Sequence, residues 1–389
     1  MSKLWPILIL GFVAFVTSFG AHVVAVNLPV YAAQVGVGVA MIGLLIAAYD
    51  AAEAVTKPAF GAIADRRGMR QTMLAGIAVF TLASLAYLFV DPRLLLLIRF
   101  LQGVGAAALS AVSLALVGAY AAERRGRAYG IYNSIKGAGY VVSPIIGGAI
   151  LLQADFAMIF VATAAVGALA FGLSLLLPRV KSSVEPGLDD DDGAGLAGLL
   201  AVFRQSSLWP WYIVTVVNMF FVGILFGFLP VRVFALGYGP LINGVILTAV
   251  SASYLLIQPL AGAAADRVRP EITIRAGLLL SGICVILTPF VAGPLLFVVA
   301  ILAGIGVGTV WTNTDALVSR MAKSGKLGAT MGVAGTFKEI GDMLGPLLIG
   351  GVSQAFGLTV GFVACGALGL VALALIANGR VGGRESAAA

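Results

Sequence analysis

Several ionisable side chains lie inside long apolar runs of this sequence, where a charge is costly unless it is paired or reached by water. Asp50, Glu53 and Lys57 stand at positions i, i+3 and i+7, which places all three on one face of a helix. Glu53 precedes Lys57 by four residues, and this order favours an ion pair along the helix. Each of the three is therefore a candidate functional residue.

Ionisable residues in other apolar runs extend this set. The cations are Lys57, Arg99, Lys136 and Lys338, and the anions are Asp50, Glu53, Asp315, Glu339 and Asp342. This near balance of charge predicts pairing around a central cavity. A carboxylic acid in a low-dielectric cavity can hold a proton near neutral pH, and a cation that approaches it favours release of that proton.

We therefore predict a set of proton-coupling residues. Asp50 and Glu53 are the predicted proton carriers, and Arg99 is their predicted switching partner. Glu339 and Asp342 are second candidates. A conformational change that alters the distance between acid and base would couple protonation to that change.

Polar and aromatic side chains of the same runs are the candidate substrate-binding residues. They are His22, Asn27, Tyr49, Lys136, Tyr140, Tyr254, Trp311 and Lys338. Two cations, Lys136 and Lys338, would suit an anionic or zwitterionic solute; alternatively, Asp50, Glu53 or Asp342 neutralises them. His22 is the single histidine, so no metal site is predicted around it. For this residue, hydrogen bonding, substrate contact and proton transfer all stay open.

The composition identifies the medium in which these residues must work. Of 389 residues, 60% are apolar and 11% are charged, against roughly 45–50% and 25% in soluble domains. The apolar residues form runs of about 20, long enough for a helix to cross roughly 30 Å of hydrocarbon. They lack the alternation of polar and apolar residues that barrel strands show. The sequence therefore predicts an all-α membrane protein.

Twelve runs are predicted to span the membrane. They cover 6–33, 39–63, 70–90, 94–120, 127–152, 156–177, 208–235, 241–264, 271–291, 294–319, 327–353 and 357–377. The first run is too long for a signal-peptide core and is expected to stay uncleaved. The acidic run at 189–192 is expected to be solvated linker rather than a metal site, because adjacent carboxylates repel one another. Cys284 and Cys365 are expected to be packing residues.

The basic residues predict the orientation. The net charge of +7 comes from short Lys and Arg clusters that fall on one side of the predicted spans, with only Arg93 and Arg232 on the other. By the positive-inside rule, both termini and the central linker are cytoplasmic. We expect a bacterial inner membrane protein that does not bind nucleic acid.

The two halves of the chain repeat at an offset of about 201 residues. The tripeptide at 28–30 recurs at 229–231, and the GAIADR segment at 61–66 recurs as GAAADR at 262–267. Lys136 recurs as Lys338 in the same ordered series. We predict one six-helix bundle over 1–178, a cytoplasmic linker over 179–207 and a second bundle over 208–389. Parallel halves of this kind can rock around a substrate site near the midplane.

The loop at 61–70 reads GAIADRRGMR and resembles the signature loop of the major facilitator superfamily, G-x-x-x-D-R-x-G-R-R, with Met69 in place of one basic residue. A carboxylate at this position can contact a helix N-terminus in one conformation and release it in another. The residues predicted to form such a gating latch are Gly61, Asp65, Arg66, Gly68, Arg70, Asp266 and Arg267.

Two further segments are similar to motifs of that family. Residues 99–105 read RFLQGVG, similar to R-x-x-Q-G-x-G, and this resemblance supports the role of Arg99. Residues 130–148 are similar to the antiporter motif of its efflux members, with Ser143 where glycine is usual. Glycine and proline there allow close helix approach and bending. The predicted packing residues are Gly139, Pro144, Gly147, Gly148 and Pro346.

The resemblance implies two pseudosymmetric six-helix bundles and a monomeric, proton-coupled transporter that exports small amphiphilic compounds or drugs by alternating access. The alternative is a symporter or exporter of an organic anion or zwitterionic metabolite. The expected partners are protons, a small solute and the lipid bilayer. The sequence lacks the H-E-x-x-H and G-x-S-x-G motifs, so we expect neither an enzyme nor a cofactor.

Overall fold

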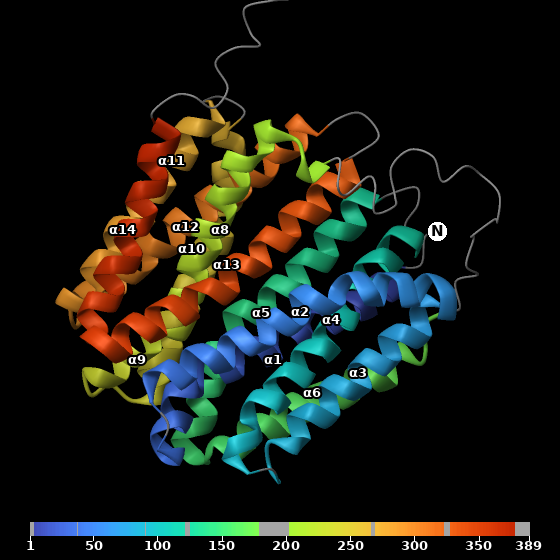
Figure 1. The fold of residues 1–389 in the computed structure, drawn as a ribbon. Coiled ribbons are helices and arrows are strands. Elements are labelled where there is room, and N and C mark those ends of the chain that lie inside the picture. The colour runs from blue at the N-terminus through green and yellow to red at the C-terminus, as the bar shows by residue number, and fades with distance from the viewer. Residues whose placement is uncertain are drawn as a thin grey trace, which may run out of the picture. The chain divides into compact units, whose positions relative to one another are not determined.

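The computed structural model describes residues 4–36, 38–89, 91–120, 125–178, 202–265, 269–322 and 327–377. Within these residues every regular element is a helix and none is a strand, which confirms the predicted all-α class (Figure 1). A helix satisfies its own backbone hydrogen bonds, so such elements can cross hydrocarbon without exposing unpaired amides.

The helices follow the predicted spans closely. The first six are α1 (Trp5–Val35), α2 (Val39–Arg67), α3 (Met69–Ala86), α4 (Leu95–Tyr120), α5 (Arg125–Gln153) and α6 (Phe156–Ser174). The later ones are α8 (Trp209–Gly227), α9 (Leu229–Ala235), α10 (Pro240–Ala265), α11 (Pro270–Leu287), α12 (Pro294–Met321), α13 (Leu327–Phe356) and α14 (Leu358–Ala377). Short 3₁₀ helices at Pro92–Leu94, Ser206–Leu208 and Thr288–Phe290 join or extend them.

Ten helical segments of the described residues are long and apolar enough to span a membrane. They coincide with the first ten predicted spans, and the seventh combines α8 and α9 in one segment, Ser206–Ala235. The last two predicted spans fall on α13 and α14. The middle of α13 carries Lys338, Glu339 and Asp342, and α14 has an apolar stretch at Leu358–Val371. Most of the predicted linker, 179–201, lies outside the described residues.

The chain forms two compact units. Unit 1 contains Met1–Val184 and Pro230–Thr248, and unit 2 contains Glu185–Leu229 and Ala249–Ala389. In unit 1, α1 packs on α5, and α4 packs on α2 and α3. The beginning of α10 belongs to unit 1, where the Thr248 hydroxyl donates to the Val141 backbone O at 2.8 Å. The predicted bundle boundaries, 1–178 and 208–389, stay a prediction.

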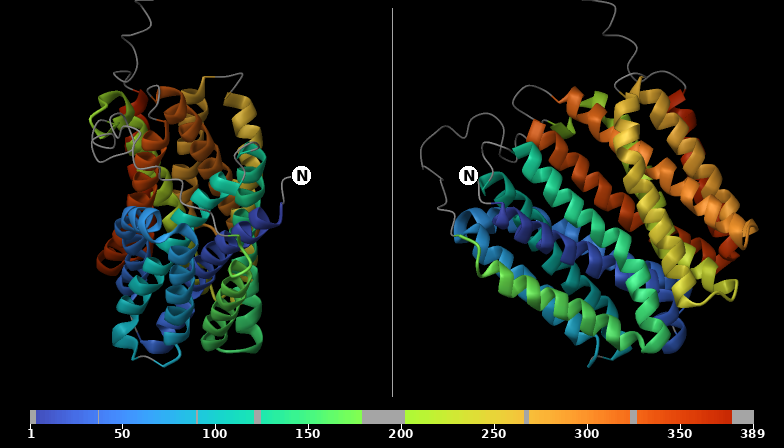
Figure 2. Two further views of the ribbon diagram at one scale, coloured as in Figure 1. Left: turned by 90° about the vertical axis from the view of Figure 1, so that its right-hand side faces the viewer. Right: turned by 180° about the vertical axis from the view of Figure 1, so that it is seen from behind.

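Unit 2 repeats the helix neighbours of unit 1. Helix α8 packs on α13, and α11 packs on α12 and α14 (Figure 2). These pairs correspond, through the internal repeat, to α1 with α5, α3 with α4, and α3 with α6, which are also in contact. These three helix pairs therefore recur in both units.

The repeat extends to single glycine contacts. A Cβ atom added at Gly103 on α4 would collide with the backbone O of Tyr49 on α2. One added at Gly304 on α12 would meet the backbone O of Val250 on α10. Both glycines and both partners differ by the same offset of about 201. Small residues let these helix backbones approach closely, which explains why glycine recurs at both positions.

Candidate functional site

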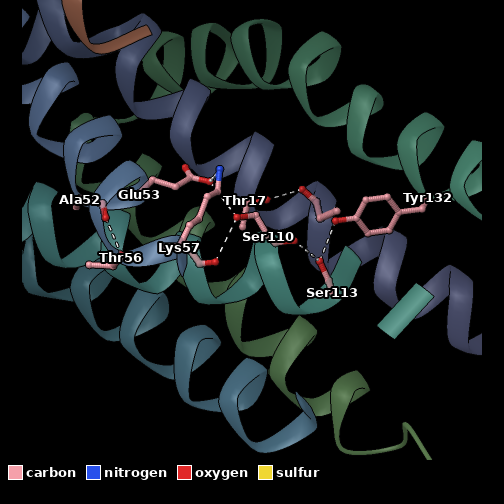
Figure 3. Close-up of polar contacts among 10 residues, drawn as sticks. Thr17, Ala52, Glu53, Thr56, Lys57, Ser110, Ser113 and Tyr132 are labelled. Atoms are coloured by element: carbon pink, nitrogen blue, oxygen red, sulfur yellow. Dashed lines mark hydrogen bonds and ion pairs between the residues drawn. The ribbon is translucent and has the colours of Figure 1, made fainter. Parts of the chain in front are cut away.

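Glu53 on α2 is the centre of a polar network in unit 1 (Figure 3). Its Oε1 lies 2.7 Å from Nζ of Lys57, which confirms the ion pair expected from their spacing. Ser110 on α4 donates its hydroxyl to the same oxygen at 3.0 Å. The Glu53 side chain is 13% exposed and that of Lys57 is 29% exposed. One oxygen of a mostly buried carboxylate is therefore held by donors from two helices.

The network continues from α4 to α5. The hydroxyls of Ser113 and Tyr132 are 2.8 Å apart, and Ser113 Oγ lies 3.4 Å from the backbone O of Ser110 (Figure 3). Because the step between the two serines passes through a backbone carbonyl, the side-chain hydroxyls form no unbroken proton path from Glu53 to Tyr132. These contacts instead hold α2, α4 and α5 in register around Glu53.

Three predicted substrate-binding residues lie in the same part of unit 1 as this carboxylate. Lys136 on α5 brings a second positive charge that interacts with Glu53 and with Tyr140. The ring of His22 on α1 meets the ring of Tyr140 edge-on, with centroids 4.3 Å apart at 74°. Nδ1 of His22 lies 2.9 Å from the backbone O of Ser18. Acidic, basic and aromatic groups from α1, α2 and α5 are thus gathered in one place.

Arg99 on α4 is buried, with 2% of its surface exposed. Its Nη1 donates to Oε1 of Gln102 at 2.8 Å, and its Nε and Nη2 donate to the backbone oxygens of Leu45 and Ala21 at 3.2 and 3.3 Å. Its guanidinium lies over the ring of Tyr49, 4.5 Å from the centroid. Within the described residues, these acceptors are all neutral. Its role as switching partner of a carboxylate stays a prediction.

Asp50 and Asn27 differ in their surroundings. Asp50 is partly buried on α2, and its charge acts on the hydroxyl of Tyr49. Asn27 is completely buried on α1. Its Nδ2 donates to the backbone O of Val23 at 2.8 Å, and Gly147 of α5 packs against its amide. In this structure Asn27 serves the contact between α1 and α5.

Unit 2 contains a second ion pair. Nζ of Lys338 on α13 lies 2.6 Å from Oδ2 of Asp315 on α12. The indole Nε1 of Trp311 donates to the same oxygen at 3.1 Å. The ammonium also lies 5.1 Å from the centroid of the Trp311 ring, within the range of a cation–π interaction. Lys338, Asp315 and Trp311 therefore form one compact cluster.

A small pocket adjoins this cluster, and in this structure it has no room for a water molecule. It is lined by Thr215, Asn218 and Met219 of α8, Trp311, Thr314 and Asp315 of α12, and Lys338 of α13. Tyr254 of α10 stacks on Trp311 with centroids 6.1 Å apart and planes 2° apart. Three predicted substrate-binding residues, Tyr254, Trp311 and Lys338, thus meet beside one pocket.

Glu339 and Asp342 lie on α13 near Lys338 and are partly buried. The backbone O of Asp342 packs against Gly223 of α8. Their role as further proton carriers stays a prediction. Among the described residues, no group of three or more His, Cys, Asp or Glu side chains is placed to hold a metal ion.

The predicted latch is described in part. Gly68 ends α2 and begins α3 with φ of +96°, a conformation that favours glycine. Arg70 donates to the backbone O of Leu175 just past α6, where a cation is favourable. Gly61 lies within α2. The side chains of Asp65 and Arg66, and residues 266–268 with Asp266 and Arg267, lie outside what the structure describes. A gating role stays a prediction.

The predicted packing residues lie at close helix contacts. Gly139 of α5 faces Ser18 and the backbone of α1, and Gly148 faces the backbone O of Pro240 within unit 1. Pro144 lies inside α5 and Pro346 inside α13. In unit 2, Pro346 packs on Gly223 of α8. These positions place glycine and proline where helix surfaces approach most closely.

Sequence reasoning missed several site residues. Ser110, Thr215 and Asn218 carry no signal of their own, because hydroxyl and amide side chains in a membrane helix commonly bond to the preceding turn. In the sequence Asp315 is only one of several buried anions, and Asp50, Glu53 and Asp342 are the candidate partners of Lys338. The pairing with Asp315 depends on the rotation of α12 against α13. The i, i+4 spacing of Trp311 and Asp315 was the available signal.

Comparison with known proteins identifies the family. The family model described as Major Facilitator Superfamily matches residues 10–252 and 211–385. The chain belongs to the Major Facilitator Superfamily. An uncharacterized MFS-type transporter, Rv1250, of Mycobacterium tuberculosis is 33% identical over 221 residues, which cover 53% of this chain and 38% of that protein. The multidrug resistance protein Stp of Mycobacterium tuberculosis is 26% identical over 91% of this chain and 76% of its own length.

Solved structures agree on the fold of this superfamily member. A bacterial homologue of the human lysosomal transporter Spinster superimposes with a TM-score of 0.83 at 15% identity, covering 97% of both chains. At this identity the likeness shows the fold alone. As a Major Facilitator Superfamily protein, the chain is a multi-pass membrane transporter of small molecules and not an enzyme.

Proposed function

We propose that this protein is a monomeric, proton-coupled antiporter that exports small amphiphilic compounds from the cytoplasm by alternating access. The observation that carries the proton coupling is the mostly buried Glu53 carboxylate, held by Lys57 and Ser110 within a spanning helix. The similarity to the multidrug resistance protein Stp supports export of drug-like solutes.

The Glu53 site has the parts that proton coupling needs. Its carboxylate and the ammonium of Lys57 are in contact in this structure, which favours the ionised acid. Lys136 of α5 adds a further cation from a different helix. A conformation in which α2 and α5 separate would weaken that field and favour uptake of a proton. Protonation and conformation are then linked.

The pocket of unit 2 supports the solute side of the proposal. Trp311 and Tyr254 offer a stacked aromatic surface, and Thr215, Asn218 and Asp315 offer polar groups beside it. An amphiphile needs both an aromatic or apolar surface and polar partners, and these side chains offer both. Such a site accepts amphiphilic compounds.

The alternative, transport of an organic anion or zwitterion, depended on two available lysines. Lys338 is already paired with Asp315 at 2.6 Å, which neutralises one of them. The structure therefore favours the amphiphile over the anion.

Transport direction under an imposed pH gradient tests the proposal. Purified protein in proteoliposomes would be given a labelled amphiphile outside, with the interior either acidic or alkaline. An antiporter accumulates solute when the interior is acidic, because protons leave as the solute enters. Accumulation with an alkaline interior would instead establish symport, and accumulation independent of the gradient would refute proton coupling.

A further inference from the structure

The Lys338–Asp315–Trp311 cluster contains a complete site for an organic cation that is already occupied by a side chain. We propose that Lys338 is an internal competitor, and that a protonated aromatic amine binds this site by displacing its ammonium from Asp315 and from the face of Trp311. This inference names the substrate class of the proposed exporter and to that extent rests on the proposed function.

The contacts of Lys338 are those that a substrate ammonium would make. Its Nζ meets a carboxylate oxygen at 2.6 Å and lies 5.1 Å from the centroid of an indole ring. Carboxylates and the faces of tryptophan rings are the groups that recognise organic cations. The same two groups would bind an exogenous ammonium, and the stack of Tyr254 on Trp311 would extend the aromatic surface under its ring.

The pocket beside the cluster has unsatisfied acceptors. Asn218 and Thr314 line it, and they are 1% and 2% exposed. Asn218 Oδ1 and Thr314 Oγ1 have no hydrogen-bond partner among the described residues. A buried oxygen without a donor is costly, and a ligand that brings N–H groups would satisfy these two. A protonated amine can donate to both oxygens, whereas a carboxylate could only accept from the Thr314 hydroxyl and would leave Asn218 Oδ1 without a donor.

Lys338 is able to leave. Its side chain is 20% exposed and that of Asp315 is 29% exposed, so neither charged group is fully buried. Lysine carries its charge on a flexible four-carbon stem, which can swing away without moving α13. Trp311 keeps its own hydrogen bond to Asp315, so the carboxylate stays oriented when the ammonium departs.

The internal repeat shows that this chemistry is specific to unit 2. By the offset of about 201, Trp311 corresponds to Ser110 and Tyr254 corresponds to Glu53. The corresponding side chains are in contact in both units, as a hydrogen bond in unit 1 and as an aromatic stack in unit 2. The position of the acid Glu53 in unit 1 thus corresponds to the aromatic residue Tyr254 in unit 2. The proposed proton site and the proposed cation site therefore lie in different units.

Three ligands with one skeleton test the proposal on the purified full-length chain in detergent. Phenethylammonium, 2-phenylethanol and 3-phenylpropanoate differ in charge but share the phenylethyl group. We expect the ammonium to bind at least about tenfold more tightly than the alcohol, a difference of about 1.4 kcal/mol, and the carboxylate to bind most weakly. Equal affinities, or tightest binding of the carboxylate, would overturn the assignment. This test needs only the wild-type protein.

Removing the competitor gives the sharper test. Lys338→Met should raise the affinity for phenethylammonium by about tenfold or more, and Asp315→Asn should lower it by a similar factor. Arg269→Met is the matched control, since it removes an exposed cation from the same unit and should change nothing. If Lys338→Met unfolds, Lys338→Gln keeps a donor to Asp315 and should show the same direction.

An unchanged or lowered ammonium affinity in both Lys338 variants would refute the competitor role. Binding in detergent requires neither a proton gradient nor a transport direction. Failure here therefore leaves the antiport proposal standing, and failure of the antiport assay leaves this site standing.

Discussion

At the scale of single residues, Glu53 combines burial with an unusually dense set of partners. A carboxylate 13% exposed in a spanning helix is held by a lysine one turn away and a serine on another helix. Such a group is costly to keep in a membrane unless it has a task. Ser110 lies on α4 and Lys136 on α5, so motion of these helices relative to α2 changes its environment.

The Glu53→Gln substitution separates proton coupling from solute transport. The amide keeps the size and the hydrogen bond from Ser110 but cannot exchange a proton. We expect proton-driven accumulation of solute to be lost, while exchange of labelled for unlabelled solute at equal concentrations persists. Asp155→Asn, at an exposed carboxylate before α6, should alter neither assay. Loss of both activities in Glu53→Gln, with a folded protein, would mean that Glu53 serves binding or structure instead.

Replacing Arg99 even with lysine is expected to destabilise the protein. Its three donors reach acceptors on α1, α2 and α4, and its plane covers Tyr49. A lysine ammonium cannot reproduce that planar fork. We expect Arg99→Lys to cost about 1.5–3 kcal/mol, the range for a hydrogen bond to a charged group, measured by thermal unfolding in detergent. Arg93→Lys in the exposed turn should stay within about 0.5 kcal/mol of wild type. Equal stability of both variants would contradict the structural account of Arg99.

At the scale of elements, glycines set how closely helices pack. Gly103→Ala adds one methyl group that would collide with the backbone of α2. We expect a loss of about 1–3 kcal/mol, seen as a lower thermal midpoint. Gly172→Ala in α6 adds a methyl group into open space and should be neutral or stabilising by up to about 1 kcal/mol, because alanine favours helix. A Gly103→Ala protein as stable as Gly172→Ala would show that α2 and α4 are free to shift apart.

The elements themselves could be predicted from sequence. Apolar runs of about 20 residues and the ordered repeat located the helices that the structure contains, because the membrane fixes both length and composition. The ion pair of Glu53 with Lys57 followed from spacing within one helix. Pairs between helices did not follow in this way. The partner of Lys338 depends on how α12 and α13 are rotated, and the hydroxyl contacts of Ser110 and Ser113 depend on how α4 faces its neighbours. Neither rotation is visible in a single sequence.

At the scale of the whole molecule, charge asymmetry predicts orientation. The turn that contains Arg93 is expected on the periplasmic side, and the segment after Arg320 is expected in the cytoplasm. Single cysteines at Arg93 and Arg320, in a chain with Cys284→Ala and Cys365→Ala, would be labelled in intact cells with a membrane-impermeant maleimide. We expect labelling at position 93 and protection at position 320. The reverse pattern would invert the topology and the direction of export.

The most direct test of the whole account is proton movement driven by solute alone. Proteoliposomes containing a trapped pH-sensitive dye would receive an amphiphilic solute outside, with no initial pH gradient and with the membrane potential clamped. Antiport predicts that the interior becomes alkaline as solute enters, and that Glu53→Gln abolishes this change. Acidification of the interior, or solute entry with no pH change in the wild-type protein, would contradict the account.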